Sequence, residues 1–398
     1  MVDQAPDEDK ELKAILEMDL DGLDTLGSDD SSFKPVVKSA PMTLERRMQA
    51  SPRLARLQEA WEKSEPGDNP AGLAYSKSVE QMSTAERSLT YKATQLKTYE
   101  TAVLQAKELY DMVCLGEVTS MAPARTIVGT FMEAMEKDRN VFLAICFHHT
   151  TSLADYLNRH AVNMCLVSLA ASISAGFSRG QVLEMGQAAL LADMGMSMVP
   201  EGIRLKAGKL TEEELAEIHK HPLNSFGLLE KTPGISDIVL AAAYQHHERL
   251  TGAGYPKRRS NGQISQAARI VAIADTLCAM VHKRSHRDAL SPYAALDKVV
   301  KMGQMNFLDA NLIKSLMRYL SAFPIGTFVE LSSGRVGRVV EANPTDVTKP
   351  IISVLRNERG QPLPMKQILQ VDLLKDRNEK ITKVLEAEAA KFKALDGF

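Results

Sequence analysis

Histidine and aspartate residues in the middle of the 398-residue chain carry its clearest capacity for chemistry. Imidazole and carboxylate groups together suit divalent zinc, manganese and iron ions. A carboxylate that bridges two such ions suits phosphoester hydrolysis, because the ions activate water and neutralise phosphate charge. The spacing is irregular and long-range, so by itself it leaves a metal site and a set of unrelated polar residues as equal alternatives. In chain order, these residues are His160, Asp193, His219, His221, His246, His247 and Asp275.

Asp275 is the strongest single indication of a site. It interrupts the apolar stretch ARIVAIADTLCAM, and a buried carboxylate is costly unless it has a metal, another cation or a hydrogen-bond partner. The adjacent His246 and His247 point about 100° apart on a regular helix. They can therefore serve one centre only if the helix ends there or if two ions are present. His219 and His282, in contrast, are expected on solvated surfaces.

Helices with short loops are expected to position these residues, between about residues 146 and 322. In TEEELAEIHKHP, Thr211 and Glu214 predict a capping box, and this helix is expected to stop at Pro222. The stretches ISDIVLAAAYQHHE and QAARIVAIADTLCAMVHK are strongly apolar and are predicted as core helices. The fold class expected for residues 146–322 is therefore mainly α.

The flanking segments differ from this region in amino-acid composition and pattern. Residues 1–75 predict a flexible acidic tail with short helices, and a docking segment around Leu57 and Trp61 is the alternative. Residues 76–145 predict a helical N-terminal region, which is either a homodimer contact or a degraded sensor. Residues 323–398 predict a small antiparallel β unit, closed by an amphipathic helix over DRNEKITKVLEAEAAKFKAL.

Composition narrows the class of protein. A net charge of −2 argues against broad nucleic-acid binding. No apolar run in the sequence approaches the roughly 20 residues that span a bilayer, and the acidic N-terminus lacks the layout of a signal peptide. The four cysteines are scattered without a CxxC pair, which indicates reduced and mostly buried thiols. We therefore expect a cytoplasmic protein without a membrane span.

The stretch from about residue 150 to residue 320 resembles the HD-GYP domain, a bacterial subgroup of the HD metal-dependent phosphohydrolases. The resemblance rests on five motifs in order: NRHAVNM, LLADMGMSMVP, HPLNSFGLL, HHERLTGAGYP and RIVAIAD. It implies an HD-type helical bundle with a two- or three-metal centre, and a small appendage such as that expected at residues 323–398. The ligands that it implies are His160, Asp193, His221, His246, His247 and Asp275.

The resemblance also implies a substrate and a way to bind it. Family members typically hydrolyse cyclic di-GMP, so cyclic di-GMP or a related nucleotide is the expected ligand. Asp193 is the expected catalytic residue, because it bridges the metals or positions the attacking water. The residues expected to bind substrate are the Gly254, Tyr255 and Pro256 loop and the basic Arg284 and Arg287.

The sequence also departs from the family's pattern. Ala192 stands in place of the histidine of the His-Asp pair, so one metal loses a ligand. Met196 replaces a lysine that would face substrate phosphate, and Tyr156 stands where members with three metals carry a glutamate. The resemblance therefore implies one or two divalent ions (iron, manganese or zinc) at a weakened centre. Further departures are Thr251, Ser225, Cys278 and the stretch RSHR.

Three functions are consistent with these observations. The first is a degenerate HD-GYP protein that binds a nucleotide or a signalling partner protein, with weak or no hydrolysis. The second is an active metal-dependent phosphodiesterase that acts on cyclic di-GMP or another phosphoester. The third is a structural scaffold for protein interactions. Nucleotide binding separates the first from the third, and metal content separates the second from the third.

Overall fold

The computed structural model describes residues 84–139, 141–148, 156–206, 208–282, 289–364 and 368–386. The chain divides into two compact units, of which one contains residues 96–398 and the other residues 25–95. Of the described elements, the long helix α5 (Thr84–Cys114) begins before the unit that contains residues 96–398, and the others lie entirely within it. The tail expected over residues 1–75 lies outside the described residues.

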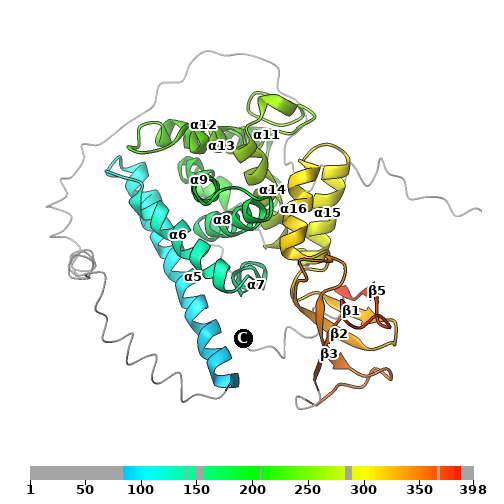
Figure 1. The fold of residues 1–398 in the computed structure, drawn as a ribbon. Coiled ribbons are helices and arrows are strands. Elements are labelled where there is room, and N and C mark those ends of the chain that lie inside the picture. Colours follow the sequence, from blue (N-terminus) through cyan, green and yellow to red (C-terminus); the bar gives the residue numbers. More distant parts are fainter. Residues whose placement is uncertain are drawn as a thin grey trace, which may run out of the picture. The chain divides into compact units, whose positions relative to one another are not determined.

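The described part of this unit is mainly α-helical, as predicted (Figure 1). The longer helices are α5 (Thr84–Cys114), α6 (Ala122–Lys137), α7 (Val141–His148), α8 (Tyr156–Ser174), α9 (Arg179–Leu191), α12 (His221–Leu229), α13 (Asp237–Gln245), α14 (Gln266–Val281), α15 (Pro292–Gln304) and α16 (Ala310–Leu320). Short helical turns connect them: η2 (Met194–Met198), α10 (Glu201–Arg204), α11 (Glu212–Ile218) and η3 (Asn261–Gln263).

The region expected to be helical over residues 76–145 is helical where it is described, in α5, α6 and the first part of α7. Among the described helices, none combines the length and the apolar character needed to cross a membrane. The cysteines are free thiols, and Cys146, Cys165 and Cys278 are buried, as predicted.

Helices α8 and α14 form the centre of the helical core and pack against each other. Residues 160–172 of α8 and residues 270–281 of α14 are all buried. A helix that is apolar on most sides belongs in the interior, so any polar side chain on it must find a partner there. His160 and Asp275 are placed in the interior by these two helices.

The short helix α11 shows both a confirmed prediction and a wrong one. Thr211 and Glu214 form the predicted capping box at its start. The helix ends at Ile218, however, and not at Pro222. Pro222 lies in the first turn of α12, where its missing N–H costs no helical hydrogen bond. His221 therefore begins a new helix instead of ending the previous one.

The C-terminal region folds as a five-stranded antiparallel sheet, as predicted. Its spatial order is β4-β3-β2-β1-β5. Val339, Ile352 and Val354 are buried on one face, which gives the sheet its own small core. The strands are β1 (Phe328–Leu331), β2 (Val336–Glu341), β3 (Ile351–Arg356), β4 (Leu369–Asp372) and β5 (Ile381–Val384).

The prediction of an amphipathic helix from residue 376 onwards was wrong at residues 381–384, which form strand β5. Residues 381–384 pair with β1, and the Thr382 hydroxyl donates a hydrogen bond to the Glu330 carbonyl. The pairing satisfies backbone groups of β1 that would otherwise form an open sheet edge, and this tertiary gain outweighs the local helical pattern. The residues of the expected helix after 386 lie outside the described residues.

Candidate metal centre

The six predicted metal ligands come together at one place in the helical core. His160 and Asp275 lie on α8 and α14, and Asp193 lies just after α9. The remaining ligands are supplied by the start of α12 and the end of α13. They form two groups whose ligand atoms lie within 4.8 Å of one another, and Asp193 belongs to both: Asp193 with His221, His246 and His247, and Asp193 with His160 and Asp275.

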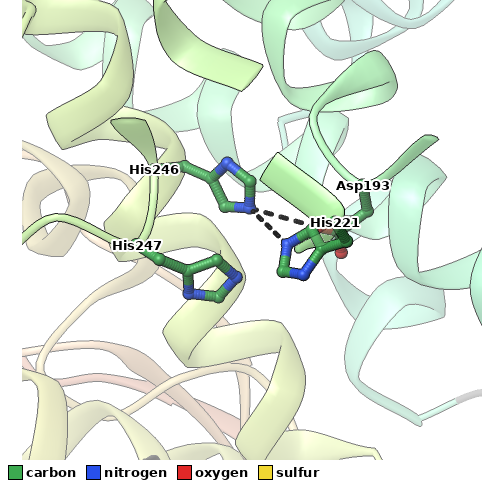
Figure 2. Close-up of side chains that lie close together, drawn as sticks. All are labelled: Asp193, His221, His246 and His247. Atoms are coloured by element: carbon green, nitrogen blue, oxygen red, sulfur yellow. Dashed lines mark hydrogen bonds and ion pairs between the residues drawn. The ribbon is translucent and has the colours of Figure 1, made fainter. Parts of the chain in front are cut away.

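The four-membered group is built around one carboxylate oxygen. Asp193 Oδ1 lies 3.2 Å from His246 Nε2 and 3.4 Å from His221 Nε2. The two Nε2 atoms are themselves 3.2 Å apart. Figure 2 shows these three side chains with their polar atoms turned toward one another and His247 beside them.

The three-membered group uses the other oxygen of the same carboxylate. His160 Nε2 lies 3.4 Å from Asp193 Oδ2 and 3.0 Å from Asp275 Oδ1. His247 Nδ1 lies 3.7 Å from Asp275 Oδ2, so this ring is near both groups. Asp193 therefore has the geometry of a carboxylate that joins two neighbouring sites.

Backbone carbonyls orient two of the histidines. His221 Nδ1 lies 2.8 Å from the Ile218 carbonyl oxygen, and His246 Nδ1 lies 3.0 Å from that of Ala243. Because a carbonyl only accepts, Nδ1 carries a hydrogen in both rings. The Nε2 atoms of both rings face each other and Asp193 Oδ1. This convergence of imidazole nitrogens on a carboxylate fits a divalent cation, and a backbone partner on the other nitrogen is typical of metal-binding histidines.

The end of α13 explains how two adjacent histidines reach one group. The helix ends at Gln245, and His246 is its C-terminal cap. The chain leaves the helix there, so His247 does not continue around a helical surface. This meets the first of the two conditions that the sequence set for a shared centre.

The charges of the site follow from burial and from these contacts. Burial raises the pKa of the Asp193 carboxyl, but hydrogen bonds and charge from His221 and His246 outweigh burial and hold that pKa well below its usual value. For Asp275, burial acts in the same way, and the hydrogen bond with His160 lowers the pKa on balance. Both carboxyls are therefore ionised at neutral pH, as metal ligands must be.

The pKa values of the two adjacent histidines, His246 and His247, shift in opposite directions. Burial lowers the pKa of His246, but its hydrogen bond and attraction to Asp193 raise the pKa overall. Burial and the neighbouring His246 and His221 hold the pKa of His247 well below its usual value. His247 is consequently a neutral imidazole with a lone pair to offer.

Ala192 contributes no ligand atom to the centre. Its side chain is fully buried, and its carbonyl accepts a hydrogen bond of 2.6 Å from the Ser225 hydroxyl. The same hydroxyl accepts a 2.8 Å bond from the Gly195 amide. Ser225, a departure from the family pattern, thus fastens the turn that carries Asp193 to α12.

The predicted substrate loop lies against the histidine pair. The Tyr255 amide donates to the His247 carbonyl at 3.2 Å, and the Tyr255 ring stacks on the His247 ring. A side chain on Gly254 would overlap the backbone of His247 and Arg249, so this close approach requires glycine. Pro256 follows Tyr255 through a cis peptide bond. Arg284 and Arg287 lie outside the described residues.

The two histidines expected on solvated surfaces differ in burial, since His219 is half-buried and His282 is buried. His219 stacks on Tyr255, beside the centre. His282 is buried, and its ring nitrogens lie 2.8 Å from the Cys278 and Cys146 carbonyl oxygens. The exposed position expected for His282 was wrong, because local polarity does not show which side chains a tertiary fold brings together.

Glu248 is a residue of the site region that the sequence did not indicate. Its carboxylate is buried and accepts 2.8 Å hydrogen bonds from the Lys257 and Arg259 amides. It therefore holds the loop that follows Tyr255. Its only signal in the sequence was a carboxylate directly after two histidines.

Comparisons with known proteins agree with this description. Residues 153–312 match the HD domain family, and residues 328–393 match a KOW domain associated with HD domains. A cyclic di-GMP phosphodiesterase of Pseudomonas aeruginosa is 28% identical over 285 residues, which cover 71% of this chain and 67% of that protein.

Two further relatives bear the same activity in their names. A cyclic di-GMP phosphodiesterase of Borreliella burgdorferi is 26% identical over 58% of this chain and 60% of its own length. A cyclic di-GMP phosphodiesterase response regulator of Xanthomonas campestris is 37% identical over 30% of this chain and 32% of its own length. The matched region thus spans about a third to two thirds of each relative. Residues 153–312 therefore form an HD domain, and the family match and the relatives together support an HD-GYP domain protein.

Proposed function

We propose that this protein binds a cyclic dinucleotide at a metal-holding HD-GYP centre and hydrolyses it weakly or not at all. The observation that carries the proposal is the inequality of the two ligand groups. One has four donors, whereas the other has three, and Ala192, the buried neighbour of Asp193 in sequence, offers no further donor. The proposal is therefore a centre that retains one complete site and has a weakened second site.

The four-membered group is the proposed primary metal site. Asp193, His221, His246 and His247 would hold the ion there, and His160, Asp193 and Asp275 would hold a second ion with lower affinity. Bound divalent iron, manganese or zinc supplies charge neutralisation and water activation in phosphoester chemistry. Asp193 orients the site by facing both groups, and the backbone carbonyls hold the His221 and His246 rings in their binding orientation.

The proposed ligand class follows from the relatives, whose names specify cyclic di-GMP and, in two Vibrio cholerae proteins, 3'3'-cGAMP. We assign the Gly254, Tyr255 and Pro256 loop to the edge of the nucleotide site and Arg284 and Arg287 to its phosphates. In this proposal the protein acts in cytoplasmic signalling through a partner protein, and residues 76–145 supply a homodimer contact or a sensor.

An active phosphodiesterase is the second candidate function. It is favoured by the four-membered group and by Asp193, which lies between the two groups and has the position of a bridging carboxylate. In that case the three remaining donors suffice for the second ion, and Asp193 positions the attacking water.

Incubation with cyclic di-GMP separates the two candidates. The purified protein is incubated with the nucleotide and Mn²⁺, or with Fe²⁺ under anaerobic conditions, and products are resolved by chromatography beside the Ala192→His variant. The proposed function predicts nucleotide binding with little or no turnover by the parent and increased turnover by the variant. Turnover by the parent equal to that of the variant would establish the second candidate instead.

A further inference from the structure

A row of stacked rings connects a residue outside the ligand groups to one inside them. The Tyr255 ring stacks on the His247 ring, with centroids 4.6 Å apart and planes 14° apart. His219 stacks on the same tyrosine, with centroids 4.0 Å apart and planes 22° apart. His219 is the C-terminal cap of α11, two residues before His221. The rings therefore join two segments that each supply a ligand.

The loop that carries Tyr255 is fixed by its own backbone. Tyr255 N donates to the His247 carbonyl, and Gly254 allows the two backbone segments to meet. Both oxygens of the buried Glu248 accept amide hydrogen bonds from the residues after the loop. Because the backbone sets the position of Tyr255, its ring is a firm surface against which another ring can be held.

His247 depends on such a surface more than the other two histidines of its group. Backbone carbonyls hold Nδ1 of His221 and of His246. Among the described residues, the polar contact of His247 is the 3.7 Å approach of its Nδ1 to Asp275 Oδ2, which is longer than a hydrogen bond. Its ring is oriented mainly by neighbouring rings, of which Tyr255 is the one stacked parallel to it.

We propose that His219 is a positioning residue that acts through Tyr255 to hold the His247 ring in its metal-binding orientation. The inference rests on the proposed metal centre and assigns no ligand role to His219. It also gives Tyr255 a role in forming the metal site, in addition to the edge of the nucleotide site. The aromatic face of His219 is the feature that matters, so an aromatic replacement should preserve the effect.

Mn²⁺ binding to the full chain tests this proposal without reference to activity. Titrations followed by the paramagnetic resonance signal of free Mn²⁺ compare the parent with His219→Ala and His219→Phe. Lys220→Ala is the matched control, because this exposed side chain lies between His219 and His221 in sequence and pairs with Glu217. We expect His219→Ala to weaken Mn²⁺ binding about tenfold, as for other residues that support a metal ligand. His219→Phe and Lys220→Ala should stay close to the parent.

A second experiment measures Mn²⁺ affinity after His219→Ala is combined with Tyr255→Leu. If His219 acts through Tyr255, then His219→Ala should have no further effect on Mn²⁺ affinity once the tyrosine is gone. Should His219→Ala fail to fold, as judged by thermal unfolding, His219→Gln replaces it with a non-aromatic side chain that keeps polarity.

The outcomes distinguish this inference from the function on which it rests. Mn²⁺ binding by His219→Ala equal to that of the parent would overturn the positioning role and leave the metal centre intact. An equal loss in His219→Phe and His219→Ala would overturn the stacking mechanism. A parent that binds no Mn²⁺ would overturn the metal centre and the inference together.

Discussion

At the scale of single residues, Asp193 has the most connected position in the site. Its two oxygens face different histidines, Oδ2 toward His160 and Oδ1 toward His221 and His246. The neighbouring Ala192 has a methyl group and therefore offers no donor. Of these two adjacent positions in the chain, Asp193 thus faces both ligand groups and Ala192 adds a donor to neither.

The Asp193→Asn substitution should remove metal binding from both groups. The amide keeps the size of the side chain but loses the negative charge that both groups share. We expect Mn²⁺ affinity to fall at least a hundredfold, at the upper end of the effects seen for residues that support a metal site. Asp237→Asn, at an exposed position in the first turn of α13, is the matched control. Retained Mn²⁺ binding in Asp193→Asn would contradict the bridging role.

At the scale of elements, the turn η2 and the helix α12 are fitted to each other around the site. The Ser225 hydroxyl accepts from the Gly195 amide and donates to the Ala192 carbonyl. A side chain at Gly195 would overlap the His221 carbonyl and the Ser225 amide. This contact fixes Asp193 relative to His221, so the geometry of the ligand group depends on how two elements pack.

Ser225→Ala should destabilise the protein by about 1–3 kcal/mol, because it leaves a buried amide and a buried carbonyl without their shared partner. The measurement is the free energy of unfolding in denaturant. Thr232→Ala removes a half-buried hydroxyl that donates to a carbonyl at the end of the same helix, and serves as the control. If Ser225→Ala lowers the free energy of unfolding less than Thr232→Ala does, the Ser225 hydrogen bonds do not stabilise the contact between η2 and α12.

The segment between β4 and β5 contains a carboxylate, Glu379, whose charge supports the fold. Burial raises the pKa of Glu379, but hydrogen bonds from Ser333, Arg335 and Ser332 outweigh burial and lower the pKa to about 2. Arg335 Nη2 lies 2.5 Å from its Oε1. A carboxyl with a lowered folded-state pKa stabilises the protein above its unfolded-state pKa, and that stabilisation is lost as pH falls toward the folded-state value.

We therefore expect Glu379→Gln to lower the thermal midpoint at pH 7 and to have a smaller effect near pH 3. The ordinary carboxyl pKa of 4.5 and the shifted value of about 2 bound the interval over which the difference shrinks. Thermal unfolding of parent and variant across this pH range is the measurement. A difference that grows as pH falls would show that the ionised Glu379 carboxyl does not stabilise the fold.

At the scale of the whole described unit, a buried polar chain links α5 to α8 and to the end of α14. The Tyr99 hydroxyl donates to Asn163 Oδ1 at 2.8 Å, and Asn163 Nδ2 lies 3.1 Å from His282 Nε2. Asn163 is one turn from His160 on α8. The N-terminal helix is therefore connected to the helix that carries a candidate ligand through hydrogen bonds.

Tyr99→Phe should cost about 1–3 kcal/mol of stability, because the buried Asn163 oxygen loses its donor. Denaturant unfolding measures the effect, and Thr101→Ala, at an exposed position on the same helix, should stay within about 0.5 kcal/mol of the parent. An effect of Tyr99→Phe no larger than this control would show that the connection contributes nothing to stability.

The sequence by itself determined the helical class of the core, the C-terminal antiparallel sheet and the six candidate ligands. The helices and the sheet follow from apolar periodicity and turn residues, and the six candidate ligands follow from the resemblance of five motifs to the HD-GYP domain. Asp275 was indicated by its place in an apolar helix, where a polar residue needs a partner. The full set was identified by the order of the motifs, because its members lie as far apart in sequence as His160 and Asp275.

The tertiary structure decided the partners of each side chain. It divided the ligands into two groups around Asp193, formed β5 within the expected C-terminal helix, stacked His219 on Tyr255 and buried His282. Each of these outcomes depends on contacts between segments distant in sequence, or across a chain turn, that no local pattern encodes. Local propensity limits the secondary structures that a segment can adopt. Long-range packing then selects the one in which the buried polar groups have partners.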